Sequence, residues 1–565
     1  MQGILARGKK IILEPQSSVL SGAFIIMSMV IVSQLLGVVR QRVLLSFFSP
    51  GDYALFLAAF RLPDLVFEVL AYGAFSSAFI PVFTKQLKKE DHDAWDTAGR
   101  VVNIGVLLFL PVALLFVLFA RPLYSIIAPG FNDLQTTNIA SLARILFVAQ
   151  GIFIVSYVIT GVLESSRRFF VPALAPLVYN IGIILGTVLL TPYIGLLAPA
   201  VGVLIGALGH LLVQLPLSYQ LGFRFIGKFR PNASVKLVGK LAAPRVLELS
   251  ILQILKTAEL TFASVMSVAA YTYLSLANSL QVVPITLFGV SLAKAALPAL
   301  TREVDDAAAF KKIFLSTLYQ MMFFIIPLTT ILIVLRIPIV RLVYGTNIFD
   351  WSATVTTGLV LSAFAIGIPI QAALTLISRA YYALHDTKTP VKFAIIDVFL
   401  TIAIQIVCVF VLQLPVWSLA LANSLAGFIQ ITLLYYFLSR KLHDGSFISL
   451  TPILKSLIGG LTSGFVMYTI LKTFDRAAWV KRLSFINSID ALKNLNFEHF
   501  VLDTRYTMNL IILAIMTSLI GMIVYVVTLW LLRSTELSMV WNLMKNRPFK
   551  KIEKESEPIT TSQTE

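Results

Sequence analysis

The chain has 565 residues, of which 58% are hydrophobic and 13% are charged, and its formal net charge is +17. Soluble domains carry about 25% charged residues, so this composition excludes a soluble globular protein. The basic residues lie between long apolar segments rather than in one patch, which is typical of a multi-spanning membrane protein and argues against nucleic acid as a partner.

Long apolar segments follow one another along the whole chain. A helix of about 18 or more apolar residues crosses the roughly 30 Å hydrocarbon core of a bilayer. The pattern therefore predicts an all-α polytopic membrane protein with about 14 transmembrane helices. The predicted spans, in chain order, are 18–47, 54–84, 100–120, 136–164, 171–191, 196–221, 243–270, 271–298, 310–335, 352–378, 390–413, 416–439, 450–472 and 506–532.

Alternate loops lie on opposite sides of the membrane, and the two sets of loops differ in their content of Lys and Arg. One side, which includes both termini, carries roughly thirty Lys and Arg and the other roughly nine. The first apolar segment is also too long for a signal peptide and lacks a clear cleavage motif. Because cytoplasmic loops are enriched in Lys and Arg, we expect both termini in the cytoplasm.

Three polar segments separate or follow the spans. Residues 226–242 are basic and predict a cytoplasmic amphipathic linker lying on anionic lipid headgroups, although a loop that only sets the topology explains them equally well. Residues 473–505 form the one long outer loop, and 536–565 form a polar cytoplasmic tail.

An internal repeat is visible at a nearly constant offset. Residues 78–85 (AFIPVFTK) match 295–302 (AALPALTR), and 170–172 precede an apolar span as 388–390 do. Six spans per copy would give both copies the same orientation in the membrane, as in some transporters. The chain is therefore predicted to consist of a first lobe (1–225), a second six-helix lobe (243–441) in parallel pseudo-repeat, and two extra C-terminal helices (442–535).

Ionisable residues inside a membrane are costly and mark functional sites. The first two spans contain Arg40, Arg42, Arg61, Asp64 and Glu68, of which the last three share one helical face. Arginine presents forked donors to phosphate oxygens, so these residues predict a site for an anionic headgroup such as a pyrophosphate.

A second set of polar residues lies in the second copy. Lys256 and Glu259 are three residues apart in span 7, Asn278 and Gln281 lie in span 8, and Asp397 lies in span 11. We expect Asn278 and Gln281 to join the substrate-binding residues. The set Glu259, Asp397 and Lys256 is the candidate for ion coupling.

Structural roles explain some of these residues as well. Arg40 and Arg42 could snorkel to the interface, and Arg61, Asp64 and Glu68 could form an internal salt-bridged packing element. His210 is a lone histidine near a helix end, for which packing is the simpler interpretation.

No catalytic or metal constellation stands out. The sequence has no P-loop, its five His show no ligand spacing, and Cys408 is its single cysteine. We therefore expect no cofactor and no metal site. Transport would be driven by the membrane potential, by a coupling ion (sodium or proton), or by the gradient of the substrate itself.

Several motifs carry a family resemblance. They are 33–40 (SQLLGVVR), 59–64 (AFRLPD), 73–81 (GAFSSAFIP), 128–131 (APGF), 170–176 (FVPALAP), 277–280 (ANSL) and 382–391 (YALHDTKTPV). Together they resemble the MurJ (MviN) family of bacterial lipid II flippases, within the multidrug/oligosaccharidyl-lipid/polysaccharide exporter (MOP) superfamily. The resemblance covers roughly residues 18–440.

The resemblance implies a transporter rather than an enzyme. It implies a multi-pass protein of the bacterial inner membrane, with two lobes around a central cavity. By alternating access the protein would move an undecaprenyl-diphosphate-linked peptidoglycan precursor, with helices 13 and 14 forming a groove for the lipid tail. A sodium ion between helices 7 and 11, as in some members, would lie near Glu259 and Asp397. We expect membrane lipids and the cell-wall synthesis machinery as further partners, no nucleic acid, and a monomer.

The chain departs from the family pattern in its cavity. Gln34, Phe67 and Ser279 stand where the family has arginines, and Asp64 stands where Asn is usual. Arg40 keeps a family arginine. The resemblance therefore implies a cavity that is less cationic and more acidic than in other members.

Three functions remain open on the sequence. The first is a lipid II flippase. The second is a flippase for another polyprenyl-linked oligosaccharide, or an ion-coupled exporter of the same superfamily. The third is a non-transporting membrane scaffold that has lost the site. Substitution of Arg40 and Arg61 discriminates among them, because a scaffold would not need either residue.

Overall fold

The structure is a computed structural model that describes residues 19–69, 78–88, 91–442, 449–475 and 507–539. All of the elements described in it are helices. Within these residues, 13 helical segments are long and apolar enough to cross a membrane. The predicted all-α polytopic fold is therefore confirmed.

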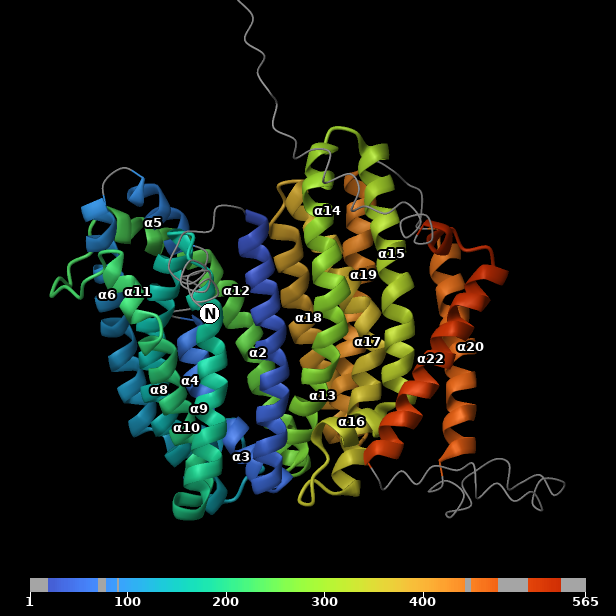
Figure 1. The fold of residues 1–565 in the computed structure, drawn as a ribbon, viewed down its shortest axis with the longest axis horizontal. Helices are drawn as coiled ribbons and strands as arrows, with labels where there is room; N and C mark the ends of the chain where they lie inside the picture. Colours follow the sequence, from blue (N-terminus) through green and yellow to red (C-terminus); the bar gives the residue numbers. More distant parts are fainter. Residues whose placement is uncertain (1–18, 70–77, 89–90, 443–448, 476–506, 540–565) are drawn as a thin grey trace, which may run out of the picture. The chain divides into compact units, whose positions relative to one another are not determined.

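The first helices in chain order are α2 (Val19–Phe47), α3 (Pro50–Ala59), α4 (Arg61–Phe67), α5 (Ile80–Leu87), α6 (Asp91–Leu118), α7 (Ala120–Ile127), α8 (Asp133–Ser165), α9 (Phe170–Ile194), the short η3 (Gly195–Leu197), α10 (Ala198–Leu212), α11 (Leu215–Gln220) and α12 (Ala233–Met266). They are followed by α13 (Ala270–Pro284), the π-helical turn η4 (Ile285–Val290), α14 (Ser291–Arg302), α15 (Ala307–Val334), α16 (Arg336–Tyr344), α17 (Trp351–Ala383), α18 (Lys388–Ile406), the π-helical turn η5 (Val407–Val411), α19 (Trp417–Lys441), α20 (Thr451–Phe474) and α22 (Thr507–Leu531) (Figure 1).

The predicted span 54–84 is broken rather than continuous. It contains α3, α4 and α5, and residues 70–77 lie outside the described part. The break between α3 and α4 has a local cause, because Pro63 has no N–H to donate to the carbonyl of Ala59, four residues earlier. The hydroxyl of Tyr124, on α7, donates to that carbonyl instead, at 2.7 Å. A side chain thus satisfies a backbone group that water cannot reach.

The chain forms two compact units. Unit 1 comprises 1–278, 343–360 and 394–426, and unit 2 comprises 279–342, 361–393 and 427–565. Helices α13, α16, α17, α18 and α19 contribute residues to both units. The predicted lobes 1–225 and 243–441 remain a prediction about the duplication of the chain.

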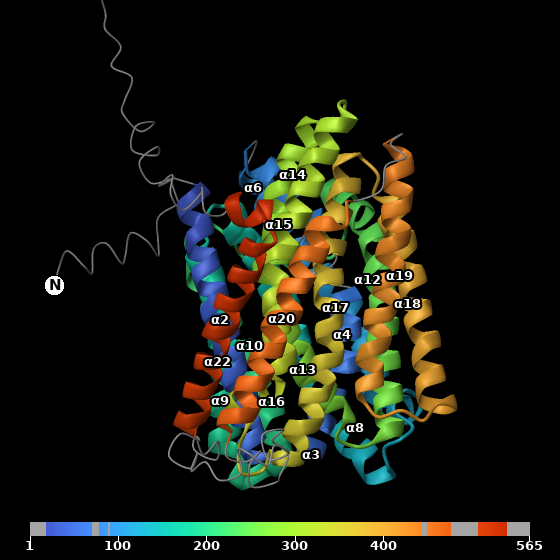
Figure 2. The ribbon, with the colours of Figure 1, turned by 90° about the vertical axis from the view of Figure 1, so that its right-hand side faces the viewer.

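In unit 1, α8, α9 and α10 pack side by side, and α2 packs along α9 (Figures 1 and 2). Small residues allow the closest approach: Gly182 and Gly186 on α9 face Gly206 and Gly202 on α10. A Cβ atom added to Gly186 would lie 2.3 Å from the Cα of Gly202. Along each helix the two glycines are four residues apart, which is the small-xxx-small spacing that lets membrane helices approach closely.

In unit 2, α15, α20 and α22 pack together around an apolar core. The buried hydroxyl of Tyr525 on α22 donates to the carbonyl of Phe323 on α15 at 2.8 Å. Ser463 on α20 donates to the carbonyl of Gly521 on α22 at 2.7 Å. Two buried hydroxyls thereby fix α22 against its neighbours.

Two turns support the predicted repeat. After α8, the N–H of Arg168 donates to the carbonyl of Leu163 at 2.9 Å, and Arg167 has φ 57°. After α17, the N–H of Asp386 donates to the carbonyl of Tyr381 at 2.9 Å, and His385 has φ 57°. The two turns are 218 residues apart and end their helices with the same left-handed geometry. The next helices, α9 and α18, each have Pro at the third position.

The predicted basic linker 226–242 is partly helical in the structure. Residues 223–232 have no helix, but α12 begins at Ala233 and continues without a break into the span. The linker is held against the start of α6, where Lys228 Nζ lies 2.8 Å from the carboxylate of Asp96 and Arg100 donates to the carbonyl of Arg230 at 2.5 Å. The predicted loop 473–505 and tail 536–565 lie almost entirely outside the described residues.

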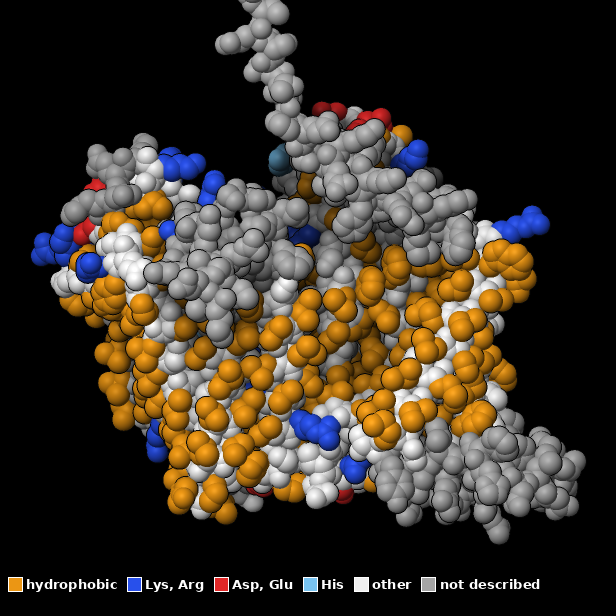
Figure 3. All heavy atoms as spheres, viewed as in Figure 1, with side chains coloured by type: hydrophobic (Ala, Val, Ile, Leu, Met, Phe, Trp, Pro, Cys, Tyr) orange, Lys and Arg blue, Asp and Glu red, His pale blue; other side chains and the backbone are white. Residues whose placement is uncertain are grey.

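The surface of the helices fits a lipid environment. On the face shown in Figure 3, apolar side chains cover the helices along most of their length. Many are well exposed, among them Leu461 (74%) and Phe465 (73%) on α20. In a soluble protein such surfaces would aggregate, whereas a bilayer solvates them.

Candidate functional site

A chain of polar contacts joins α4 to α12 inside unit 1. Arg61 is buried, with 5% exposure, and donates to the side-chain carbonyl of Gln253. The amide of Gln253 donates to the carboxylate of Glu68. Lys256 Nζ lies 3.3 Å from the same carboxylate. Helical spacing explains the arrangement, since Gln253 and Lys256 lie three residues apart and meet the α4 face that carries Arg61 and Glu68.

Two further carboxylates belong to this cluster. Asp64 accepts a hydrogen bond from Gln150 of α8 at 2.6 Å. Glu259 accepts one from Asn423 of α19 at 2.9 Å. Asp64 and Glu259 each interact electrostatically with both Arg61 and Lys256. We call these five ionisable residues (Arg61, Asp64, Glu68, Lys256 and Glu259) the charge cluster.

The charge cluster is not neutral when all its members are ionised. Three carboxylates and two cationic side chains leave a formal charge of −1. Among the described residues, no group of three or more His, Cys, Asp or Glu is placed to hold a metal ion. The cluster is thus a mixed, hydrogen-bonded site rather than a set of metal ligands.

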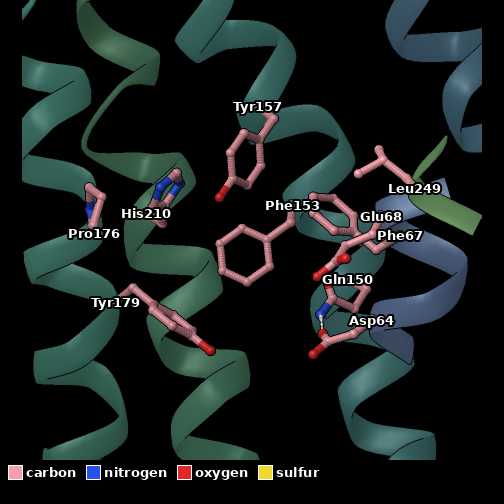
Figure 4. A pocket seen from close by; sticks show the side chains of 10 residues that line it. All are labelled: Asp64, Phe67, Glu68, Gln150, Phe153, Tyr157, Pro176, Tyr179, His210 and Leu249. Carbon is pink, nitrogen blue, oxygen red and sulfur yellow. Dashed lines mark hydrogen bonds between the residues drawn. The ribbon is translucent and has the colours of Figure 1, made fainter. Parts of the chain in front are cut away.

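A cavity of about 420 Å³ adjoins the charge cluster in unit 1 (Figure 4). Side chains from α4, α8, α9, α10 and α12, together with Glu68 at the end of α4, enclose it. The lining residues are Asp64, Phe67, Glu68, Gln150, Phe153, Tyr157, Pro176, Tyr179, His210 and Leu249. Its size lies within the range of small-ligand pockets.

Arg40 lies beside this cavity and Arg42 does not. Arg40 Nη1 donates to Asn180 Oδ1 on α9 at 2.9 Å, and the charges of Arg40 and Asp64 both act on Tyr179. Arg42 Nη1 reaches the carbonyl of Val343 at 3.5 Å, at an exposed position. The structure therefore places Arg40 near the cavity.

Three predicted residues are not brought into the charge cluster. Asn278 is exposed on α13, and Gln281 is buried but belongs to unit 2. Asp397 on α18 is half-buried, and its Oδ1 has no hydrogen-bond partner among the described residues. No contact within the described part of the chain joins Asp397 to Glu259 or Lys256. The ion-coupling role of Glu259, Asp397 and Lys256 remains a prediction.

Some residues of the site were missed by reasoning from the sequence. Gln150 and Asn423 each donate to a carboxylate of the charge cluster. His210, interpreted from the sequence as a packing residue, lines the cavity and shares a buried hydrogen-bond network with Ser156 and Gln214. The sequence did offer a signal for these residues. Each is an amide or imidazole inside an otherwise apolar span, and such a group rarely goes unpaired in hydrocarbon.

Comparison with known proteins identifies the family. The family model described as "Lipid II flippase MurJ" matches residues 46–490. The chain belongs to the lipid II flippase MurJ family. A flippase is a transporter, so the sequence-based predictions of the family and of a transporter are confirmed.

Individual MurJ relatives have low sequence identity to this chain, but they align with it over most of its length. The chain is 28% identical to a probable lipid II flippase MurJ of Rhizobium meliloti (strain 1021), over 75% of this chain and 82% of the relative. It is 25% identical to the lipid II flippase MurJ of Burkholderia cenocepacia, over 65% of this chain and 73% of that protein.

Solved structures show the same fold. A lipid II flippase MurJ in an inward closed conformation aligns with a TM-score of 0.69 at 24% identity, covering 88% of this chain and 98% of that one. An inward-facing multidrug resistance MATE family transporter of the MOP superfamily aligns with a TM-score of 0.61 at 12% identity, covering 74% and 98%.

Proposed function

We propose that this chain carries lipid II, the lipid-linked peptidoglycan precursor, across the bacterial inner membrane by alternating access. The observation that carries this proposal is the MurJ family match over residues 46–490. The helices that fit a bilayer and the charged groups inside unit 1 agree with it. Both termini would then lie in the cytoplasm, as the distribution of Lys and Arg favours.

Arg40 and Arg61 are suited to hold the diphosphate of the substrate. The Nε of Arg61 is buried without a hydrogen-bond partner among the described residues. Such a donor is costly to leave unpaired, so an incoming phosphate oxygen would be bound strongly. Arg40 uses Nη1 to bind Asn180 and keeps further donors. Asn278 and Gln281 would contact the sugar or peptide once the substrate is bound.

Complementation tests this function. The native lipid II flippase of a bacterium is depleted, the chain is expressed, and exposure of lipid II on the outer leaflet is measured. We expect wild-type chain to restore growth and exposure, and Arg40→Ala to lose at least 10-fold in rate because a charge-assisted contact contributes about 1.5–3 kcal/mol. Failure of well-expressed wild type, with a same-species flippase as positive control, would favour another polyprenyl-linked substrate or a scaffold.

Ion coupling is a further proposal for Glu259. Glu259 is paired with the neutral Asn423, and the cations Arg61 and Lys256 act on it from within the charge cluster. A carboxylate in such a place can gain and lose a cation, sodium or proton, during a transport cycle. The isosteric Glu259→Gln keeps a hydrogen bond to Asn423 but removes the charge.

We expect Glu259→Gln to abolish the dependence of flipping on ions and to leave precursor affinity within about twofold. Flipping by the variant is measured in vesicles with and without a sodium gradient, a pH gradient and a membrane potential. Asp133→Asn, at an exposed carboxylate on α8, is the matched control. If Glu259→Gln responds to every gradient as wild type does, Glu259 is not the coupling residue.

A further inference from the structure

The cavity in unit 1 has a wall of aromatic rings. Phe153 lies at its centre, with ring centroids 5.2 Å from Tyr179, 5.2 Å from His210, 6.0 Å from Tyr157 and 6.2 Å from Phe67. These rings come from α4, α8, α9 and α10, so no single helix sets the wall. Aromatic faces carry negative partial charge and attract cations at distances up to about 6 Å.

The opposite side of the cavity is acidic. Asp64 and Glu68 line it, together with the amide of Gln150, and Figure 4 shows these three side chains close together. No Lys or Arg is among the lining residues of the described chain. The cations Arg61 and Lys256 bind Gln253 and Glu68 instead, and Arg40, beside the cavity, binds Asn180.

Polar atoms in this cavity remain available to a ligand. His210 is 4% exposed, and its Nδ1 is 2.6 Å from Ser156 Oγ. Its Nε2, and the hydroxyl of Tyr179, have no hydrogen-bond partner within the described part of the chain. When the ring hydrogen is on Nδ1, Nε2 accepts a hydrogen bond. Both atoms belong to side chains that line the cavity, so a ligand there could reach them.

We propose that the unit 1 cavity binds an alkylammonium group. Its –NH3+ donates to Asp64 and Glu68 while its carbon chain lies against Phe153, Tyr157 and Tyr179. The cavity, at about 420 Å³, is far larger than a bare metal ion needs and suits an organic cation.

Two sources can supply this group. One is an amino group on the peptide of the lipid-linked precursor, in which case the inference rests on the proposed function and the cavity selects the peptide. The other is a free organic cation. In both cases the recognition is the same, carboxylate on one side and aromatic rings on the other.

The first experiment measures binding of n-butylammonium to the full chain in lipid nanodiscs by calorimetry. The uncharged N-butylacetamide, of similar shape, is the control ligand. We expect saturable binding of the ammonium and at least 10-fold weaker binding of the amide. Asp64→Asn with Glu68→Gln should weaken ammonium binding at least 10-fold. Phe153→Leu should weaken it severalfold, whereas the exposed Asp133→Asn should not.

The second experiment separates the sources and the proposed function. Vesicles containing the chain are loaded with lipid II whose peptide amines are free or acetylated. Slower flipping of the acetylated form, with competition by n-butylammonium, assigns the cavity to the precursor. Equal flipping of both forms, with ammonium binding retained, assigns it to a free cation. Absence of ammonium binding, or binding that survives Asp64→Asn with Glu68→Gln, overturns the inference even if lipid II is flipped normally.

Discussion

Arg61→Ala is expected to abolish lipid II flipping while the chain still reaches the membrane. Arg61 is buried on α4 and contacts Gln253, and its Nε has no partner among the described residues. A diphosphate that received two hydrogen bonds from this guanidinium would lose about 1.5–3 kcal/mol for each of them. The combined loss corresponds to a rate lower by a factor on the order of 100 or more.

The measurement is growth of a flippase-depleted strain together with lipid II exposure. Arg121→Ala is the matched control, because the Arg121 side chain is 57% exposed at a helix end and lies 3.5 Å from the carboxylate of Asp133. Arg61→Lys should also fail, since an ammonium keeps the charge but not the fork that matches two phosphate oxygens.

Arg61 also contributes to the fold, so stability is measured in parallel. Removing one member of a buried charged network leaves the others unpaired, which costs about 3–5 kcal/mol where burial is complete. Because Glu68 keeps Lys256, we expect the loss here to be smaller and the variant to be recovered from the membrane. Wild-type flipping by Arg61→Ala would remove Arg61 from the proposed site.

Gly186→Leu is expected to prevent folding of unit 1. Any Cβ at Gly186 would lie 2.3 Å from the Cα and 2.8 Å from the N of Gly202, both backbone atoms of α10. Backbone cannot rotate away as a side chain can, so α9 and α10 must separate. The cost should exceed the about 1–3 kcal/mol of ordinary overpacking, because the whole α9–α10 contact is involved.

The amount of monodisperse protein extracted from the membrane and its melting temperature measure this effect. Gly239→Leu is the control, because Gly239 lies on α12 with no atom within 4 Å of an added Cβ. Gly186→Ala should fall between the two. Recovery of Gly186→Leu in normal amounts, with an unchanged melting temperature, would show that α9 and α10 are not held by this close approach.

The membrane fold, the family and much of the charge cluster could be predicted from the sequence. Span prediction succeeds because lipid solvates each residue of a helix separately, so local hydropathy decides which segments cross. The helix of Arg61, Asp64 and Glu68 could be recognised because a spacing of three or four residues places them on one face. The break at Pro63 is also local, although the sequence did not show that Tyr124 compensates for it.

Which polar groups contact one another could be seen only in the folded chain. Gln253 contacts Arg61 across 192 residues, and Asn423 contacts Glu259 across 164. Such pairs depend on the rotation of each helix about its axis and on how closely small residues let helices approach, and periodicity within one span contains neither. For the same reason the sequence could not show whether Asp397 contacts Glu259, and the described residues have no contact between these two side chains. His210 became a lining residue of a cavity only once α4, α8, α9 and α10 had packed around that cavity.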